Sequence, residues 1–159
     1  VTVYDQRREA AKKYQKEMEE KYKIPVMVCD SVEEAVKGAE IICTVTPSKE
    51  PYLKAEWITP GAHINAVGAF TPNTREIESS LMAKAKLYAD QVEAMKKECG
   101  EYLIPKNEGL FGEEHITGSI GGILAGQVPG RENDTEITLF DALGLAVEDV
   151  ACGRFLCRE

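Results

Sequence analysis

Short apolar runs alternate with amphipathic stretches over residues 1–90 of the chain. The apolar runs are rich in β-branched side chains, which is typical of strands. We expect strands at residues 1–4, 26–29, 41–45, 64–67 and 87–89. Between the first two runs, Ala10, Ala11, Tyr14 and Met18 recur at spacings near those of a helix, which predicts a helix to about residue 21.

The connections between these runs are short and carry helix signals. Ser31 and Glu34 form a capping box for a helix that ends at Gly38. Strands that are continuously apolar are typical of a parallel sheet that is buried on both faces by helices. The pattern therefore predicts an α/β chain with a doubly wound parallel sheet.

The last third of the chain has a different pattern. Residues 103–114 are rich in Gly, Pro and Asn, and we expect a loop there. A short helix at 119–126, a strand at 136–140 and a final helix at 143–157 follow, and the final helix has apolar residues available for a core. We divide the chain into a partial doubly wound domain at 1–130 and a C-terminal strand and helix at 131–159.

Composition excludes several classes of function. The 159 residues carry a net charge of −8, which argues against nucleic-acid binding that is independent of the base sequence. No apolar run is long enough to span a membrane, and we expect a cytoplasmic protein. The five cysteines include no C-x-x-C pair, so we expect reduced thiols and no metal site.

Asp5 closes the first strand and precedes a helix. In a dinucleotide-binding fold an acidic residue here takes the hydroxyls of the adenine ribose, although an Asp at the end of a strand is more often a helix N-cap. The Gly-rich phosphate turn of such a fold precedes this acid by about 20 residues, so we expect that turn and the first strand to lie outside the chain. Residues 118–122 are an alternative phosphate loop, but Ser119 is better interpreted as a helix cap.

Two further segments lie where strands end. Thr44, Val45 and Thr46 follow the third strand, and residues 67–70 follow the fourth, with Gly68 allowing a flat ring to approach the backbone. Simple strand termination and a turn glycine are the alternatives. We interpret His63 and His115 as structural residues.

The chain resembles the ornithine cyclodeaminase/mu-crystallin family over nearly its whole length. The matching residues are 3–5, 31–36, 38–42, 44–46, 51, 57, 60–68, 75–76, 100–101, 126, 130–131, 138–141, 144 and 148–149, with H-I-N-A-V-G and T-L-F-D-x-x-G the most specific. The resemblance implies a Rossmann-like fold that here lacks its first strand and Gly-rich loop, joined in the whole protein to a substrate and dimerisation domain.

The resemblance also implies roles for individual residues. Asp5 would hold the adenine ribose, Gly144 would touch the substrate, and Leu143 would lie against the nicotinamide. The expected cofactor-binding residues are Asp5, Arg7, Thr44, Val45, Thr46, Val67, Gly68, Ala69, Phe70 and Leu143. The residues that bind the substrate carboxylate in the family fall outside the chain, so we assign no catalytic residue.

Phe70 occupies the position of an aspartate in cyclodeaminase-like members, and a phenyl ring cannot move a proton. We therefore expect part of an imine (pyrroline-2-carboxylate-type) reductase, with ornithine cyclodeaminase or alanine dehydrogenase as alternatives and a non-enzymatic, hormone-like ligand binder as the alternative of another class. NAD is the expected cofactor and NADP the alternative, because Asp5 repels a 2′-phosphate that Arg7 and Arg8 attract. The expected partners are an amino-acid or cyclic imine substrate and a second copy in a homodimer, and residues 1–159 alone should be inactive.

Overall fold

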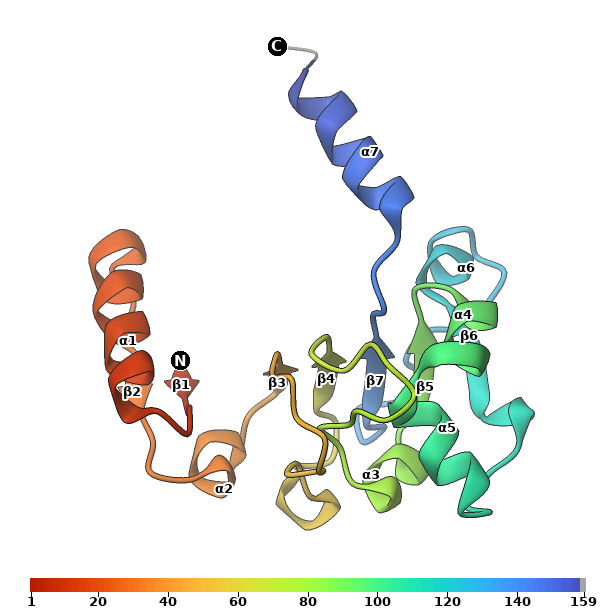
Figure 1. Cartoon of the computed structure of the whole chain (residues 1–159), viewed down its shortest axis with the longest axis horizontal. Coiled ribbons are helices and arrows are strands. Elements are labelled where there is room, and N and C mark those ends of the chain that lie inside the picture. Colours follow the sequence, from red (N-terminus) through yellow and green to blue (C-terminus); the bar gives the residue numbers. More distant parts are fainter. Residues whose placement is uncertain (158–159) are drawn as a thin grey trace.

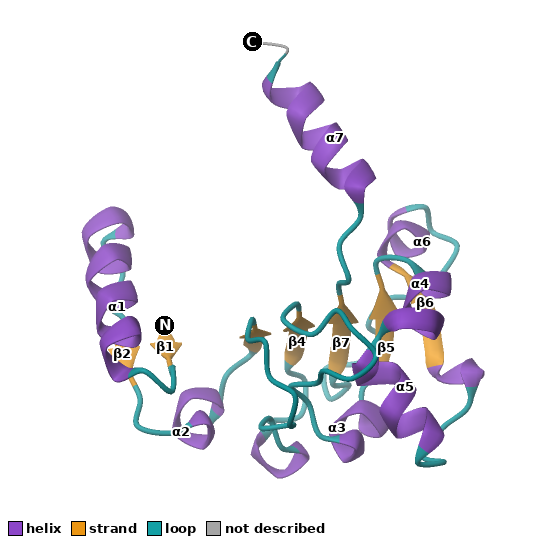
Figure 2. Cartoon of the chain, viewed as in Figure 1, coloured by secondary structure: helices purple, strands orange, loops and turns teal. Residues whose placement is uncertain are grey.

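Every strand pairing in the part of the chain that the structure describes is parallel. The structure is a computed structural model that describes residues 1–157 (Figures 1 and 2). The strands are β1 (Thr2–Val3), β2 (Met27–Val28), β3 (Ile41–Thr44), β4 (His63–Ala66), β5 (Lys86–Ala89), β6 (Ile116–Ser119) and β7 (Thr138–Asp141). The helices are α1 (Arg8–Tyr22), α2 (Val32–Val36), α3 (Ser79–Lys84), α4 (Val92–Glu98), α5 (Gly100–Asn107), α6 (Ile120–Leu124) and α7 (Ala146–Leu156).

Five strands form one sheet in the order β3-β4-β7-β5-β6. The last residues of the first four, Thr44, Ala66, Asp141 and Ala89, pair in register across the sheet. The segments that follow these strands therefore leave the sheet at one edge, which we call the carboxyl edge. β7 comes last in the chain but lies at the centre of the sheet, so a division at residue 130 does not coincide with a boundary of the sheet.

Helices cover only one face of this sheet at β3. Ile42 and Thr44 are buried, whereas Ile41 and Cys43 on the other face are exposed. The buried face contributes Ile42, Ile64, Leu87 and Leu139 to a core completed by Leu81 and Met82 of α3, Met95 of α4 and Tyr102 of α5. The expectation that both faces are buried is wrong for β3, because α3, α4 and α5 pack together against a single face.

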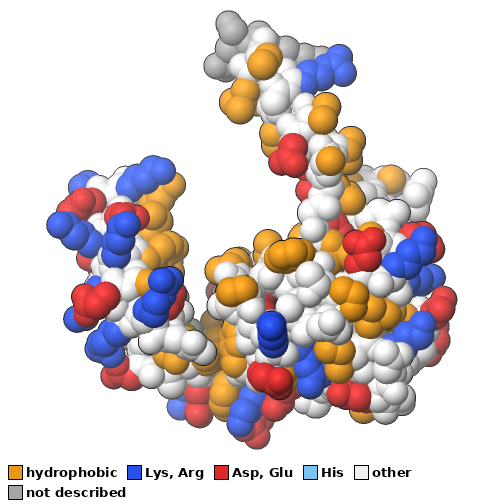
Figure 3. All heavy atoms as spheres, in the orientation of Figure 1, with side chains coloured by type: hydrophobic (Ala, Val, Ile, Leu, Met, Phe, Trp, Pro, Cys, Tyr) orange, Lys and Arg blue, Asp and Glu red, His pale blue; other side chains and the backbone are white. Residues whose placement is uncertain are grey.

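β1 and β2 pair with each other and form a unit with α1 and α2 that is separate from the larger sheet (Figure 1). Between β1 and β3 lies a hollow of about 390 Å³ lined by residues of both strands, α2 and Tyr14 of α1. Figure 3 shows this hollow, with hydrophobic side chains on the side of α1 that faces it. Ile41 and Val45 are each 69% exposed there. The two sheets thus leave a gap beside β3.

Residues 103–114 are only partly a loop, because α5 extends to Asn107. The expectation that this segment is irregular rested on its Gly and Pro residues, and Pro105 does lie inside the helix. Glu101 and Tyr102 are fully buried at the start of α5. Burial of these two side chains outweighs the unfavourable helix propensity of Pro105, since tertiary packing routinely overrides propensity.

The final helix forms where the sequence predicts it, but it packs against nothing in residues 1–157. α7 extends away from the sheet (Figures 1 and 2), and Val147, Val150 and Phe155 are 66–71% exposed. The apolar residues expected to enter a core therefore remain on the surface of this chain. Among the described residues, no helix has the length and apolar character needed to cross a membrane.

We expect residues 1–159, produced alone, to self-associate through the unpaired edge of β3, because free backbone groups on a strand edge pair with another chain. Ile41→Lys adds a charge at this edge and should weaken association roughly tenfold. Leu124→Lys is the matched control, because Leu124 on α6 is 84% exposed and distant in the sheet order from β3. Sedimentation velocity over a range of concentrations measures the effect, and equal behaviour of the two variants would contradict the expectation.

Candidate functional site

The carboxyl edge of the sheet brings together three of the segments that the sequence singles out. Residues 44–46 end and follow β3, residues 67–70 follow β4, and residues 143–144 follow β7. β4 lies between β3 and β7, so the three segments leave the sheet side by side. Ligands of open parallel sheets bind outside the carboxyl ends of the strands. This edge is therefore the candidate binding site.

A second hollow connects this edge to Asp5. It has a volume of about 480 Å³ and lies between the segment after β1 and the segment after β3. Its lining residues are Tyr4, Asp5, Gln6, Arg7, Val32, Thr46, Pro47, Ser48 and Tyr52. Asp5, Arg7 and Thr46, which are far apart in sequence, thus line one cavity.

Asp5 uses only one of its carboxylate oxygens within the described chain. Oδ1 accepts a hydrogen bond of 2.7 Å from the backbone N–H of Arg7, and the Arg7 Nε lies 3.7 Å from the same oxygen. Oδ2 has no donor among residues 1–157 and is free to accept from a ligand hydroxyl. Arg8, in contrast, pairs with Asp30 and does not line the hollow. Of the two arginines, Arg7 alone is placed to contact a ligand of Asp5.

The other expected site residues differ in exposure. Val45, Val67, Phe70 and Gly144 are exposed, Leu143 is half-buried against the core, and Thr44 and Ala69 are buried. The buried hydroxyl of Thr44 has no hydrogen-bond partner within the described part of the chain. Both histidines bond to protein atoms instead: His63 Nδ1 to Thr138 Oγ1 at 2.8 Å, and His115 Nε2 to the Met82 carbonyl at 2.7 Å. Ser119 caps α6 by accepting from the Gly122 N–H at 3.1 Å, as predicted.

Glu76 is the principal residue of the site that the sequence did not reveal. Its side chain is fully buried beneath the carboxyl edge. Oε1 accepts from the Thr46 N–H at 2.6 Å, the Thr46 hydroxyl at 2.7 Å and the Tyr52 hydroxyl at 2.6 Å, while Oε2 accepts from the Gly68 N–H at 3.1 Å. Burial, and then the bond to Glu76, raise the pKa of Tyr52. The Thr46 hydroxyl, expected to bind a ligand, is thus committed to Glu76.

Gly68 is required for a different reason from the one that the sequence suggested. A Cβ at this position would overlap the backbone N and O of Thr46 and the Glu76 carboxylate. The space of the absent side chain is therefore filled by protein rather than left open for a flat ring. Gly68 allows the segment after β4 to pack directly on the segment after β3.

Comparison with known proteins identifies the family of this chain. The model of the ornithine cyclodeaminase/mu-crystallin family matches residues 1–158. The chain belongs to the ornithine cyclodeaminase/mu-crystallin family. It is 40% identical over 156 residues to the ketimine reductase mu-crystallin of Mus musculus, a match that covers 98% of this chain and 46% of the relative.

Two solved structures of the family have the same fold. The Δ1-pyrroline-2-carboxylate reductase of Thermococcus litoralis, in complex with NADH and L-proline, matches with a TM-score of 0.93 and 39% identity over 96% of this chain and 47% of that one. A dimeric archaeal alanine dehydrogenase with bound NAD matches with a TM-score of 0.90 and 40% identity over 97% of this chain and 47% of that one. The chain spans about half the length of the relatives that it matches. The expected fold, a Rossmann-like α/β domain, is confirmed.

Two further buried carboxyl groups lie behind Glu76 in this family member. Glu101 accepts from the backbone N–H groups of Glu76, at 2.5 Å, and of Ile77, at 3.3 Å. These bonds favour the charged form, but burial outweighs them and raises the pKa of Glu101 to about 8, with Asp141 contributing. Asp141 is fully buried at the end of β7, and neither carboxyl oxygen has a hydrogen-bond partner among residues 1–157. Burial raises its pKa to about 7.

Asp90 holds the third segment of the edge. It follows β5 and is 8% exposed. Its Oδ2 accepts from the Gly144 N–H at 2.8 Å, and its Oδ1 accepts from the Gln91 N–H at 2.6 Å. Gly144 has a φ of +89°, which favours glycine. Acidic side chains thus hold all three segments of the carboxyl edge through backbone N–H groups.

We expect the free energy of unfolding to fall as the pH rises from about 4 to about 8. Glu101 and Asp141 keep their protons in the folded chain up to pKa values of about 8 and about 7, whereas the unfolded chain releases them near pH 4. Folding therefore binds protons, and the stability present below pH 4 is lost as the pH rises through the folded pKa values.

Asp141→Asn should remove part of this pH dependence, on the order of 4 kcal/mol, because the amide stays neutral at every pH. Urea denaturation at a series of pH values measures the slope. Glu113→Gln is the control: bonds to Lys106 and Lys96 lower the pKa of Glu113, so this group contributes no loss of stability as the pH rises. An unchanged slope in Asp141→Asn would show that Asp141 is not protonated in the folded chain.

Proposed function

We propose that the chain is the dinucleotide-binding part of an NAD-dependent ketimine reductase that acts on cyclic imines of the pyrroline-2-carboxylate type. The observation that carries this proposal is that Asp5 lines a hollow that adjoins a carboxyl edge with three glycine- or threonine-containing segments. The proposal is supported by similarity to a ketimine reductase at 40% identity and to a pyrroline-2-carboxylate reductase at 39% identity.

The residues present fit a dinucleotide. Asp5 offers a free oxygen, Oδ2, to the hydroxyls of the adenine ribose in the hollow of about 480 Å³. Residues 67–70 and Leu143 are placed for the nicotinamide half, and the exposed Gly144 for the substrate. When bound, the reduced nicotinamide supplies the hydride for the imine carbon. The protein contributes position and electrostatics.

Phe70 favours reduction over cyclodeamination. Its side chain is 63% exposed at the carboxyl edge and carries no group that moves a proton. Asp5, the acidic residue that lines the adjoining hollow, is proposed to bind ribose. Alanine dehydrogenase is the second candidate, because the archaeal alanine dehydrogenase is 40% identical to this chain.

We propose a homodimer and a cytoplasmic location for the whole protein. The exposed apolar side chains of α7 support an interface or a contact with the remaining polypeptide, since these side chains are unpacked in residues 1–157. One similar structure is a dimer with bound NAD. The segment after β7 would thus lead from the sheet to the substrate and dimerisation part.

The decisive experiment compares substrates on the full-length protein, meaning the polypeptide of the relatives' length that contains residues 1–159. Oxidation of NADH is followed with pyrroline-2-carboxylate or with pyruvate plus ammonia, and ornithine is tested for release of ammonia. We expect the highest kcat/KM for the cyclic imine. A preference for ornithine or for pyruvate would replace the proposal with one of the alternatives, and tight ligand binding without turnover would indicate a binding protein.

Asp5→Ser should shift cofactor preference toward NADPH by at least roughly tenfold in the ratio of kcat/KM values. At a separation of about 4 Å the repulsion between a carboxylate and a 2′-phosphate is on the order of 4 kcal/mol before Arg7 offsets part of it. Glu17→Gln removes a similar charge on the exposed face of α1, outside the hollow, where Glu17 pairs with Lys13, and should leave the ratio unchanged. Equal use of NADH and NADPH by the unmodified protein would contradict the role of Asp5.

A further inference from the structure

Glu76 has one carboxylate oxygen for each of two segments at the carboxyl edge. Oε1 accepts from the N–H and hydroxyl of Thr46, after β3, and Oε2 accepts from the N–H of Gly68, after β4. We propose that Glu76 is a positioning residue. It fixes residues 46–48, which share the hollow with Asp5 and are called the adenosine-side segment, relative to residues 67–70, the nicotinamide-side segment. The inference rests on the proposed function, because it requires that this edge bind a dinucleotide.

The contacts around Glu76 leave little room for the two segments to move separately. The carboxylate is fully buried, and the backbone of Thr46 fills the space beside Gly68 that a side chain would occupy. Val67 N–H also donates to the Thr44 carbonyl at 3.0 Å. The Glu76 carboxylate, the Val67–Thr44 bond and a bond of 3.2 Å from the Arg75 N–H to the Ser48 carbonyl therefore hold the segment that lines the hollow at a fixed distance from residues 67–70.

Glu76 is itself held from behind by a second acidic residue. Glu101 accepts from the backbone N–H groups of Glu76 and Ile77 and fixes the chain at this point. Gly100 precedes it, and a Cβ at Gly100 would overlap the carbonyls of Thr71 and Thr74. α5 thus packs directly beneath the segment that joins Gly68 to Glu76. The position of Glu76 is therefore set independently of any ligand.

The substitution Glu76→Gln would affect the hydrogen bonds to Thr46 and the hydrogen bond to Gly68 unequally. Its Oε1 can still accept from Thr46 and Tyr52, but its Nε2 is a donor and cannot accept from Gly68 N–H. Glu76→Gln therefore releases the nicotinamide-side segment while keeping the adenosine-side segment in place. If Glu76 only stabilised the fold, its substitution would weaken ligand binding at both halves of the site to the same extent.

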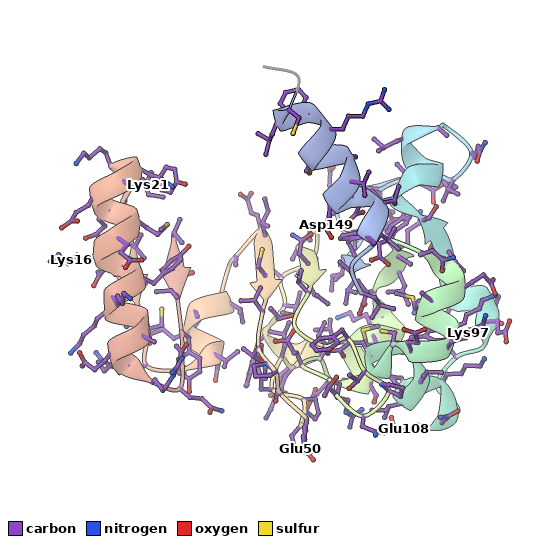
Figure 4. All side chains as sticks on the ribbon, turned by 45° about the horizontal axis from the view of Figure 1, so that its top comes forward. Lys16, Lys21, Glu50, Lys97, Glu108 and Asp149 are labelled. Atoms are coloured by element: carbon purple, nitrogen blue, oxygen red, sulfur yellow. The ribbon has the colours of Figure 1, made fainter. Side chains whose placement is uncertain are left out.

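The test compares two probes on the full-length protein, namely NADH and ADP-ribose, which lacks the nicotinamide. For Glu76→Gln we expect the Kd for NADH to rise about tenfold, as for the loss of one charge-assisted hydrogen bond. The Kd for ADP-ribose should change little. Glu50→Gln is the matched control: Glu50 is exposed in the loop after β3, and its side chain points into solvent in Figure 4. This control should bind both probes as the unmodified protein does.

The outcomes separate the two proposals. An unmodified protein that binds neither probe would contradict the proposed function. If the unmodified protein binds both, equal losses for the two probes in Glu76→Gln, or no loss for NADH, would overturn the role of Glu76.

A measurement on the unmodified protein does not depend on the folding of the variant. Amide hydrogen exchange should find the Gly68 and Thr46 N–H groups protected to the same degree as those of β4. Exchange of the Gly68 N–H at the rate of an open loop would show that the carboxylate does not hold it, and would also overturn the inference.

Discussion

Hydrogen bonds to the buried carboxylate of Glu76 join the segments that follow β3 and β4, and the rest of the candidate site is arranged around them. Buried polar groups are hydrogen-bonded, and here two of the donors are backbone N–H groups at the ends of two neighbouring strands. Glu101 repeats this arrangement one layer deeper, and Asp90 repeats it at the end of β5. Acidic side chains therefore shape the backbone of an edge that is proposed to bind an anionic cofactor.

This arrangement keeps negative charge below the edge rather than on it. Burial raises the pKa of Glu101 to about 8 and that of Asp141 to about 7, so near pH 7 Glu101 is mostly protonated and Asp141 is about half protonated. At the surface of the site, Asp5 is the acidic group in the hollow beside the edge, with Arg7 against it. The gap between β1 and β3 adjoins the same region and leaves the β3 edge unpaired. The proposed dinucleotide site thus lies next to an unpaired strand edge.

The sequence predicts most of the strands because the apolar pattern that defines a strand lies within a few consecutive residues. The first five strands form near their predicted positions, and Ser31 and Ser119 cap helices as expected. The open face at β3 could not be predicted, because it depends on which elements pack against the sheet. The role of Glu76 could not be predicted from the sequence either, because its hydrogen-bond partners are up to 30 residues away along the chain. Arg75-Glu76 and Gly100-Glu101 both match the family in sequence, but the match does not show which groups either glutamate bonds to.

The position of a bound dinucleotide decides whether the carboxyl edge is a cofactor site. A crystal structure of the full-length protein with NADH tests this in one measurement. We expect the adenine-ribose hydroxyls within hydrogen-bonding distance of Asp5, and the nicotinamide beside residues 67–70 and Leu143, with Glu76 still bonded to Thr46 and Gly68 and touching no cofactor atom. A dinucleotide bound elsewhere, or a direct contact between Glu76 and the cofactor, would contradict the account.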